Sequence, residues 1–409
     1  MKIVIIGGGP AGMMCASICS QNPQNEVVLL DSNEKLGKKL YITGKGRCNL
    51  TNLVPPQEFL QNVVTNPKFL YSCIYAFTSQ DTRDYFDSLG LKTIVERGNR
   101  VFPSSQKASD VTKAFVSALT TNNVKINLNC QVKSINKQND GGFKLVTNSG
   151  QIICDALVIA TGGSSYKSTG STGDGYTFCK SFGHNIVSPK PSLVPILLKK
   201  YDGKLAGLSL KNVTATIKTK DKTISEFGEM LFTHNGVSGP IVLSLSALAN
   251  KMDLKSSTFS IDLKPSLSIE QLDNRLLRDF EEGKTKQLKN YLKTLMPISL
   301  VQEFLCKIKI DENTRLCDIT KPQRESIIRL LKDFSYDILS LDNIDYAIVT
   351  SGGVDVREVN PKNMMSKLVP NLFIVGELLD VDAYTGGFNI QIALSTGHAA
   401  GEYLRDNSI

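Results

Sequence analysis

The chain has 409 residues, of which 41% are hydrophobic and 21% charged, and its formal net charge is +8. This composition is that of an ordinary folded protein and excludes collagen-like, disordered and disulfide-scaffold chains, while the length favours two or three domains. The first apolar run, residues 3–6, is far shorter than a membrane span of ~20 residues, so neither a signal peptide nor a span is expected. The nine cysteines form no C-x-x-C pair, which argues against metal sites and structural disulfides and favours the cytoplasm.

The N-terminus predicts a nucleotide-binding turn. Residues 2–6 have the pattern of a buried strand, and residues 11–18 have helical spacing. Between them Gly7, Gly9 and Gly12 form G-x-G-x-x-G: the first permits a tight turn, the second lets backbone approach a diphosphate, and the third allows close packing of helix on strand. The helix N-terminus then offers free N–H groups to phosphates.

A second strand, "EVVLLD", ends in an acid at the spacing that a dinucleotide site requires. Asp31 follows Gly12 by nineteen residues, where a carboxylate can accept the ribose 2′-hydroxyl. The alternative is a glycine-rich turn without a ligand, and the position of Asp31 argues against it.

The next stretch, "GKKLYITGKGRCNLTN" (37–52), can be a phosphate cradle, a redox-active thiol or a mobile loop. It leaves the carboxyl end of the second strand, beside the predicted nucleotide, and its glycines at 44 and 46 let backbone pass close to a cofactor. Lys38, Lys39 and Arg47 are candidates to balance a diphosphate, and Asn49 and Thr51 to bond ribityl or phosphate oxygens. A disulfide reductase needs two cysteines here and the segment has one, Cys48, so we interpret the segment as the cradle and Cys48 as a packing residue.

A distant segment returns to the same fold. Residues 372–375 predict a strand, which Gly376 and Glu377 end and where a carboxylate can accept a ribityl hydroxyl. A helix follows to about residue 404, and Gly386 and Gly387 precede Phe388 at its N-terminus, whose dipole suits the edge of a flavin that becomes negative on reduction. Packing alone is the alternative explanation of these glycines. A further strand ends in Thr161-Gly162-Gly163. This is the A-T-G-G form seen where FAD enzymes of the glutathione-reductase type leave their nucleotide fold.

Residues from about 191 to 345 predict an insertion. "NVTATIKTK" and "STFSIDLKP" alternate like paired strands, and from Ser268 the pattern is helical: Ser268 with Gln271 forms a capping box and Gly283 supplies a stop. Thr320 with Gln323 opens another helix, expected to run through residue 334. Residues 190–222 hold eight lysines against two aspartates, which is either a solvated face or an attraction for an anionic substrate.

Three residues are candidates for catalysis. His234 in "FTHNGVSGP" lies in a glycine-rich loop and can be a general acid facing a flavin or a structural residue bonded to backbone. Lys367 and Tyr384 are the other two. His184 and His398 are interpreted as structural.

The ordered motifs "GKKLYITGKGRCNLTN", "ERGNRVFPSSQKASDV", "ATGGSSYKSTGSTGDGY", "GEMLFTHNGVSGP" and "TGGFNIQIALSTG" resemble the aminoacetone-oxidase-like, BaiN-like FAD-binding flavoproteins from end to end. The resemblance implies an α/β fold: a split Rossmann-like domain of the glutathione-reductase type (1–190 and 346–409) with an inserted β-barrel (191–267 and 337–345) and a helical subdomain (268–336). It implies one non-covalent FAD and no metal. Two departures are Asp31, where Glu is more usual, and Tyr384, where a small residue is expected. The motifs and the resemblance together assign FAD contacts to Gly7, Gly9, Pro10, Ala11, Gly12, Asp31, Ser32, Lys39, Thr43, Gly44, Gly46, Arg47, Asn49, Thr51, Val132, Thr161, Gly162, Gly376, Glu377, Asp380, Gly387, Phe388, Asn389 and Ile390.

The expected function is that of an FAD-dependent oxidoreductase that passes a hydride between flavin N5 and a small organic substrate. An enone-type reductase with NADH or NADPH as the donor is favoured. No second G-x-G-x-x-G follows a strand, so no dedicated nicotinamide domain is expected and the donor would dock transiently over the flavin. A flavin amine oxidase that produces hydrogen peroxide and a non-enzymatic, RNA-associated flavoprotein are the alternatives. The lack of aromatic residues interleaved with the lysines argues against a nucleic-acid partner, and an anionic substrate is favoured. The sequence does not indicate the oligomeric state.

Overall fold

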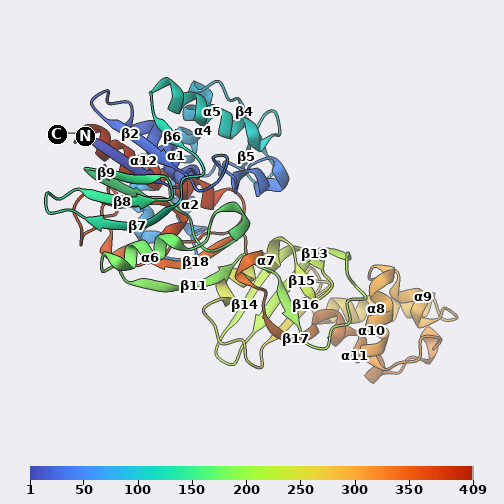
Figure 1. The fold of residues 1–409 in the computed structure, drawn as a ribbon. Coiled ribbons are helices and arrows are strands. Elements are labelled where there is room, and N and C mark those ends of the chain that lie inside the picture. The colour runs from blue at the N-terminus through green and yellow to red at the C-terminus, as the bar shows by residue number, and fades with distance from the viewer. Residues whose placement is uncertain (408–409) are drawn as a thin grey trace. The chain divides into compact units, whose positions relative to one another are not determined.

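The computed structural model describes residues 1–407 and divides the chain into two compact units (Figure 1). The first consists of Met1–Ser192 and of the chain from Asn343 onward, and the second is Leu193–Asp342. Each unit has its own hydrophobic core. The chain leaves the first unit once and returns to it, as a discontinuous fold with an insertion requires.

A five-stranded parallel sheet forms the centre of the first unit. Its strands are, in spatial order, β19 (Leu372–Ile374), β10 (Ala156–Ile159), β1 (Lys2–Ile6), β2 (Glu26–Leu30) and β6 (Lys125–Asn127). The apolar residues of β1 and β10 are buried, as in parallel strands that are covered on both faces. The predicted α/β fold is confirmed.

Helix α1 (Pro10–Cys19) and the long helix α12 (Phe388–Asp406) pack closely against each other beside this sheet (Figure 1). Glycines make this contact possible. A Cβ at Gly397 would lie 2.3 Å from the carbonyl oxygen of Ala11, and one at Gly401 would lie 2.9 Å from that of Cys15. The two helices, nearly four hundred positions apart in the chain, are thereby held together beside the parallel sheet.

Smaller sheets and helices complete the first unit. One antiparallel sheet has the order β7 (Val132–Lys137), β8 (Phe143–Thr147), β9 (Gly150–Cys154); another has the order β3 (Thr51–Asn52), β5 (Arg100–Pro103), β4 (Thr93–Glu96); and β11 (Ile186–Ser192) pairs with β18 (Val349–Val354). The remaining α-helices are α2 (Pro56–Gln61), α3 (Tyr71–Ala76), α4 (Ser79–Ser88), α5 (Ala108–Thr121) and α6 (Asp174–Ser181).

The second unit contains the predicted barrel, which is closed and has six strands. Their order is β12 (Ile196–Leu198), β15 (Gly236–Ser238), β14 (Thr223–Phe232), β13 (Ser209–Lys218), β16 (Thr258–Asp262) and β17 (Phe334–Leu341). The two strands predicted from "NVTATIKTK" and "STFSIDLKP" are β13 and β16, and they pair in antiparallel register with Ala215 opposite Ile261. Helix α7 (Pro240–Ala249) packs on β14.

Four helices lie in the second unit between β16 and β17: α8 (Ile269–Glu282), α9 (Leu288–Leu292), α10 (Ile298–Ile308) and α11 (Lys321–Lys332) (Figure 1). Both predicted capping boxes are present, at Ser268 and Thr320, and Gly283 ends α8. These helices share one core with the barrel, and the ring of Phe304 stacks on that of Phe334.

The prediction that the last of these helices continues to Phe334 is wrong. Helix α11 ends at Lys332, and Phe334 is the first residue of β17. From there Phe334, Tyr336 and Ile338 are buried while Asp337 and Leu339 are exposed. This alternation has the period of a strand, and the hydrogen bonds to β16 outweigh the helical continuation.

Candidate functional site

The carboxyl ends of the parallel strands bring the predicted cofactor residues to one edge of the first unit. β1 leads into the glycine turn, β2 into Asp31, β10 into Thr161 and β19 into Gly376. These strands are parallel and adjacent, so their carboxyl ends lie at the same edge of the sheet, where ligands of such folds bind. We call this edge the cofactor edge.

The three glycines of the first turn have different surroundings. A Cβ at Gly7 would lie 2.4 Å from the carbonyl oxygen of Ala160, and one at Gly12 would lie 1.9 Å from that of Gly7. A Cβ at Gly9 would meet nothing within 4 Å. Gly7 and Gly12 are therefore required by packing, whereas the space over Gly9, at the N-terminus of α1, is open to a ligand.

Asp31 is held beside this turn. One carboxylate oxygen accepts the N–H of Gly8 at 2.8 Å, and the other accepts the backbone and side-chain N–H groups of Asn33 at 2.7 and 3.0 Å. A carboxylate has about four lone-pair sites, so the fixed side chain retains acceptor capacity for a ribose hydroxyl.

The segment 37–52 follows an irregular path. Gly44, Lys45, Gly46 and Cys48 have φ of +56°, +59°, +86° and +60°, a run of left-handed residues that a regular helix cannot contain. Arg47 ties the segment to the neighbouring small sheet: it donates to Glu96 and Gln106, both at 2.9 Å, and lies over the ring of Phe102. Its guanidinium thus has two protein partners, and its contact with a diphosphate stays a prediction.

Cys48 is fully buried, and burial raises the pKa of its thiol to about 12. A thiol with this pKa is protonated at neutral pH and is a weak nucleophile. All nine cysteines of the chain are free. The surroundings of Cys48 are those of a packing residue.

Lys39 and Glu377, 338 positions apart in the chain, form an ion pair at the cofactor edge. The ammonium group of Lys39 lies 2.7 Å from a Glu377 carboxylate oxygen and donates to the Ser165 hydroxyl at 2.8 Å. Glu377 also accepts the Ser165 hydroxyl at 3.0 Å and the Thr350 N–H at 2.8 Å. The carboxylate is therefore oriented by a cation, a hydroxyl and an amide.

The N-terminus of α12 is seated on β3. Gly387, with φ of +105°, precedes the helix, and a Cβ there would lie 2.5 Å from the backbone of Thr51. Asn389 fixes the loop before the helix, because its amide group bonds the N–H and the carbonyl oxygen of Ala383 and the carbonyl oxygen of Tyr384. Phe388 is buried, with its ring edge against Phe59.

The residues present fit an FAD. Besides the open space over Gly9, two of the buried side-chain oxygens that lack a hydrogen-bond partner within residues 1–407 bear on this edge: Asn49 Oδ1 and Thr161 Oγ1. Both belong to segments at the cofactor edge, and a buried oxygen without a partner is costly unless a ligand supplies one. The open turn, the oriented acids and the two oxygens suit the diphosphate and hydroxyl groups of FAD.

The other assigned contacts lie at or close to this edge. Gly376 approaches α1, with its Cβ position 2.9 Å from Ala11, and its N–H donates to the Thr396 hydroxyl. Val132 begins β7, next to the segment 129–130 that bonds the backbone of residues 31–33. Asp380 accepts hydrogen bonds from the Asn66 side chain. Pro10, Ser32, Thr43, Gly162 and Ile390 flank these residues in the chain.

Of the three catalytic candidates, Tyr384 and Lys367 belong to the first unit and His234 to the second, and the two in the first unit lie apart from each other. Tyr384 lies half-buried in the loop before α12, and its N–H donates to the carbonyl oxygen of Asn62. Lys367 is exposed at the opposite end of β19, where the N–H of Ser366 bonds Leu372, and its ammonium group donates to the carbonyl oxygen of Arg357. His234 is exposed in the second unit, between β14 and β15.

Sequence reasoning missed Ser165, Thr350 and Asn52. Ser165 and Thr350 orient Glu377, and the Asn52 amide donates to the carbonyl oxygens of both Gly98 and Gly386 at 3.0 and 3.1 Å. The pair of serines directly after A-T-G-G was the available signal for Ser165. Nothing local marks Asn52, because its partners are distant in the chain.

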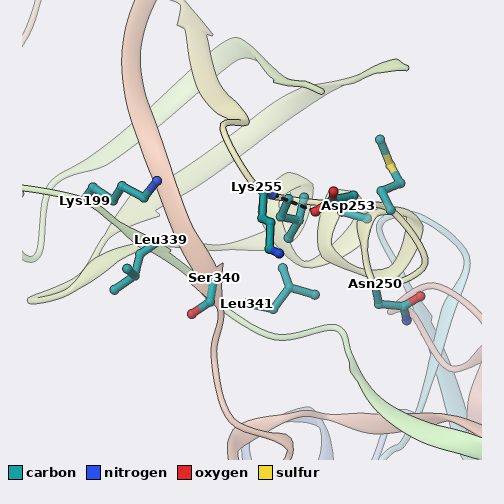
Figure 2. Close-up of a pocket in the computed structure, with 10 residues that line it drawn as sticks. Lys199, Asn250, Asp253, Lys255, Leu339, Ser340 and Leu341 are labelled. Carbon is teal, nitrogen blue, oxygen red and sulfur yellow. Dashed lines mark hydrogen bonds between the residues drawn. The ribbon is translucent and has the colours of Figure 1, made fainter. Parts of the chain in front are cut away.

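A separate hollow of about 300 Å³ lies in the second unit, between β17 and the chain after α7 (Figure 2). Figure 2 shows Lys199, Lys255 and Leu339 among its lining residues, and none of the predicted site residues belongs to it. Within residues 1–407 no cluster of His, Cys, Asp and Glu has the makeup of a metal site. None of the helices in that range combines the length and apolarity needed to cross a bilayer.

The model of the family described as HI0933-like protein Rossmann domain matches residues 1–403. The chain belongs to this family. The resemblance found in the sequence is thereby confirmed, and the protein is an FAD-dependent oxidoreductase with a Rossmann-like FAD-binding domain.

Two relatives align with this chain over nearly its whole length. A 3-dehydro-bile acid delta(4,6)-reductase of Clostridium scindens is 30% identical over 404 residues, 98% of each chain. A ribosomal RNA dihydrouridine synthase of Escherichia coli is 32% identical over 404 residues, 98% of this chain and 97% of the relative. A solved 3-ketosteroid delta1-dehydrogenase from Sterolibacterium denitrificans shares the fold, with a TM-score of 0.53 over 99% of both chains at 10% identity.

Proposed function

We propose that this flavoenzyme reduces a carbon–carbon double bond that is conjugated with a carbonyl group, with NADH or NADPH as the transient electron donor. The names of the two relatives support this reaction class. A 3-oxo group beside Δ4,6 double bonds is a conjugated dienone, and dihydrouridine is uridine whose 5,6 double bond, conjugated with the C4 carbonyl, is saturated. The two substrates differ in size and share this one reactive group.

The observation that carries the proposal is the convergence of the glycine turn, Asp31, Glu377 and the N-terminus of α12 at the cofactor edge. Bound FAD supplies the hydride at its N5. The α1 N-terminus would hold the diphosphate over Gly9, Asp31 a ribose hydroxyl, and Glu377 a ribityl hydroxyl. The α12 N-terminus would favour the negative charge of the reduced ring.

The proton that must reach the carbon next to the carbonyl needs a donor, and Tyr384 is the candidate whose loop leads into the α12 N-terminus. Its loop is held by Asn389 and by the bridge between Val63 and Ala383, so its backbone position is fixed beside the α12 N-terminus. We propose that the Tyr384 hydroxyl gives up this proton. Lys367, at the far end of β19, is not part of the proposal, and His234 remains the second candidate.

The donor would use the same space as the substrate. Residues 1–407 contain one parallel sheet and hence no second Rossmann-type nucleotide fold. NADH or NADPH would therefore bind before the substrate and leave before it arrives, which predicts ping-pong kinetics.

The experiment is anaerobic reduction of the holoprotein, followed by the visible absorbance of its flavin. We expect NADH or NADPH to bleach the flavin. A conjugated enone or a uridine-containing RNA should then restore the flavin absorbance, and this acceptor should gain the mass of one hydrogen molecule. Tyr384→Phe should slow reoxidation and leave reduction by the nicotinamide unchanged. Bleaching by a small primary amine and by neither nicotinamide would replace this proposal with an amine oxidase.

A further inference from the structure

A positively charged turn joins β4 to β5. Glu96 and Arg100 are opposite each other in the antiparallel register, and Arg97, Gly98 and Asn99 connect them. Gly98 and Asn99 have φ of +76° and +57°, which makes the connection tight. We call residues 96–100 the cationic turn.

The cationic turn is fastened to the loop that leads into α12. The buried Asn52 amide donates to the carbonyl oxygen of Gly98 at 3.0 Å and to that of Gly386 at 3.1 Å. The N–H of Leu53 donates to the carbonyl oxygen of Asn99 at 2.7 Å. The turn is thus held one side chain away from the T-G-G loop at the cofactor edge.

The charges of this turn are unbalanced. Its one carboxylate, Glu96, is paired with Arg47 at 2.9 Å. Arg97 is exposed and Arg100 half-buried, and neither has a carboxylate partner in the part of the chain that the structure describes. The Arg100 Nε donates to the carbonyl oxygen of Arg97 at 3.0 Å, and its guanidinium lies 5.9 Å from the Phe102 ring centre. Arg100 is therefore held in place without its charge being neutralised.

We propose that Arg97 and Arg100 bind an oxyanion, a phosphate or a carboxylate, that belongs to the molecule which the flavin reduces. The proposal rests on the proposed function above. Guanidinium groups present planar pairs of N–H donors that match the oxygens of phosphates and carboxylates. Their attachment through Asn52 to the loop beside α12 places this charge where a substrate at the cofactor edge arrives, and it attracts anions over a distance.

The proposed site assigns the anion of the substrate to Arg97 and Arg100, whereas the sequence pointed to the lysines at 190–222. Of the lysines at 190–222, Lys204 is paired with Asp202 and Lys218 with Asp333, and all except Lys190 belong to the second unit. The cationic turn belongs to the same unit as the predicted FAD contacts. The anion can come from an RNA backbone or from the carboxylate of a small enone, and the experiment separates these sources.

The test compares Arg97→Gln/Arg100→Gln with Lys137→Gln/Lys180→Gln, which removes the same charge from exposed positions on β7 and α6. Each holoprotein is reduced with dithionite, and its flavin reoxidation is followed with a uridine-containing RNA, a carboxylated enone and the methyl ester of that enone. For the anionic substrates we expect the arginine variant to raise KM about tenfold with little change in kcat. For RNA, the slope of log KM against log salt concentration should fall by roughly 0.7 for each phosphate contact that is lost. The ester and the lysine variant should behave as wild type. Equal melting temperatures and FAD contents establish that both variants are folded.

An unchanged KM for both anionic substrates in the arginine variant would overturn the site, as would an equal rise in the lysine variant. Anaerobic reduction of the same variants by NADH and by NADPH is measured alongside. A loss confined to reduction by NADPH, with NADH and reoxidation unaffected, would assign the anion to the donor and also overturn the proposal. If no conjugated compound reoxidises wild-type flavin, the proposed function fails. The site is then judged by anisotropy with a labelled RNA and a labelled carboxylated enone on the oxidised holoprotein, where about tenfold weaker binding of either to the arginine variant supports it and equal binding of both overturns it.

Discussion

Replacing Gly9 and Gly12 by alanine should separate cofactor binding from folding at two positions of one motif. Gly9 has φ of −77° and ψ of −177°, a conformation that alanine adopts freely, and the added methyl group meets nothing within 4 Å in the protein. At Gly12 the methyl group would lie 1.9 Å from the carbonyl oxygen of Gly7. The added methyl group therefore enters open space in Gly9→Ala and collides with backbone in Gly12→Ala.

The magnitudes follow from these distances. The clash at Gly12 lies about 1.5 Å inside ordinary contact, and overpacking of this kind costs ~1–3 kcal/mol or more of the free energy of unfolding. Gly9→Ala should leave the apoprotein as stable as wild type or up to ~1 kcal/mol more stable, because alanine restricts the unfolded chain. It should nevertheless weaken FAD binding about a hundredfold, since moving the diphosphate off the α1 N-terminus removes two charge-assisted hydrogen bonds of ~1.5 kcal/mol each.

Denaturant unfolding of the apoproteins and titration of each with FAD, followed by quenching of flavin fluorescence, measure the two effects. We expect Gly12→Ala to shift the unfolding midpoint and Gly9→Ala to shift the dissociation constant. Wild-type FAD affinity in Gly9→Ala would mean that the diphosphate does not lie over this turn. Wild-type stability in Gly12→Ala would refute the packing argument for the third glycine.

Three further outcomes are expected. Cys48→Ser should retain FAD and turnover, because a buried thiol with a pKa of about 12 takes no part in redox chemistry; lost turnover with FAD still bound would make Cys48 chemical. Glu377→Gln should raise the dissociation constant for FAD about tenfold in the same titration, since the neutral amide no longer pairs with Lys39, and an unchanged constant would remove Glu377 from the site. Burial against the Phe77 ring lowers the pKa of His398 to about 4, despite a Glu402 oxygen 3.4 Å away. The resulting stability is fully present above the ordinary value of 6.5 and is lost as pH falls from 6.5 to 4, by at most roughly 3 kcal/mol. His398→Phe should flatten that part of a denaturation-against-pH curve, and a curve of unchanged slope would contradict the argument.

The amino-acid sequence by itself determined the features that depend on neighbours in the chain. The glycine turn after β1, the acid after β2, the capping boxes at Ser268 and Thr320 and the strands β13 and β16 all follow from local spacing and alternation. A segment with a clear period of 2 or 3.6 residues favours one kind of element, so its neighbours in the chain often suffice to predict it. The end of α11 was misplaced because both patterns meet at residues 332–334, where the partner strand decides.

Tertiary structure alone decided which side chains meet. Lys39 and Arg47, both candidates to balance a diphosphate, form ion pairs with Glu377 and Glu96, which the sequence did not predict. Asn52 joins the cationic turn to Gly386 across more than three hundred residues. Such contacts depend on the order of strands in the sheet and on the glycines that let α1 and α12 approach each other. A charge or an amide bonds whichever partner the fold brings within about 3 Å, and local sequence carries no record of that partner.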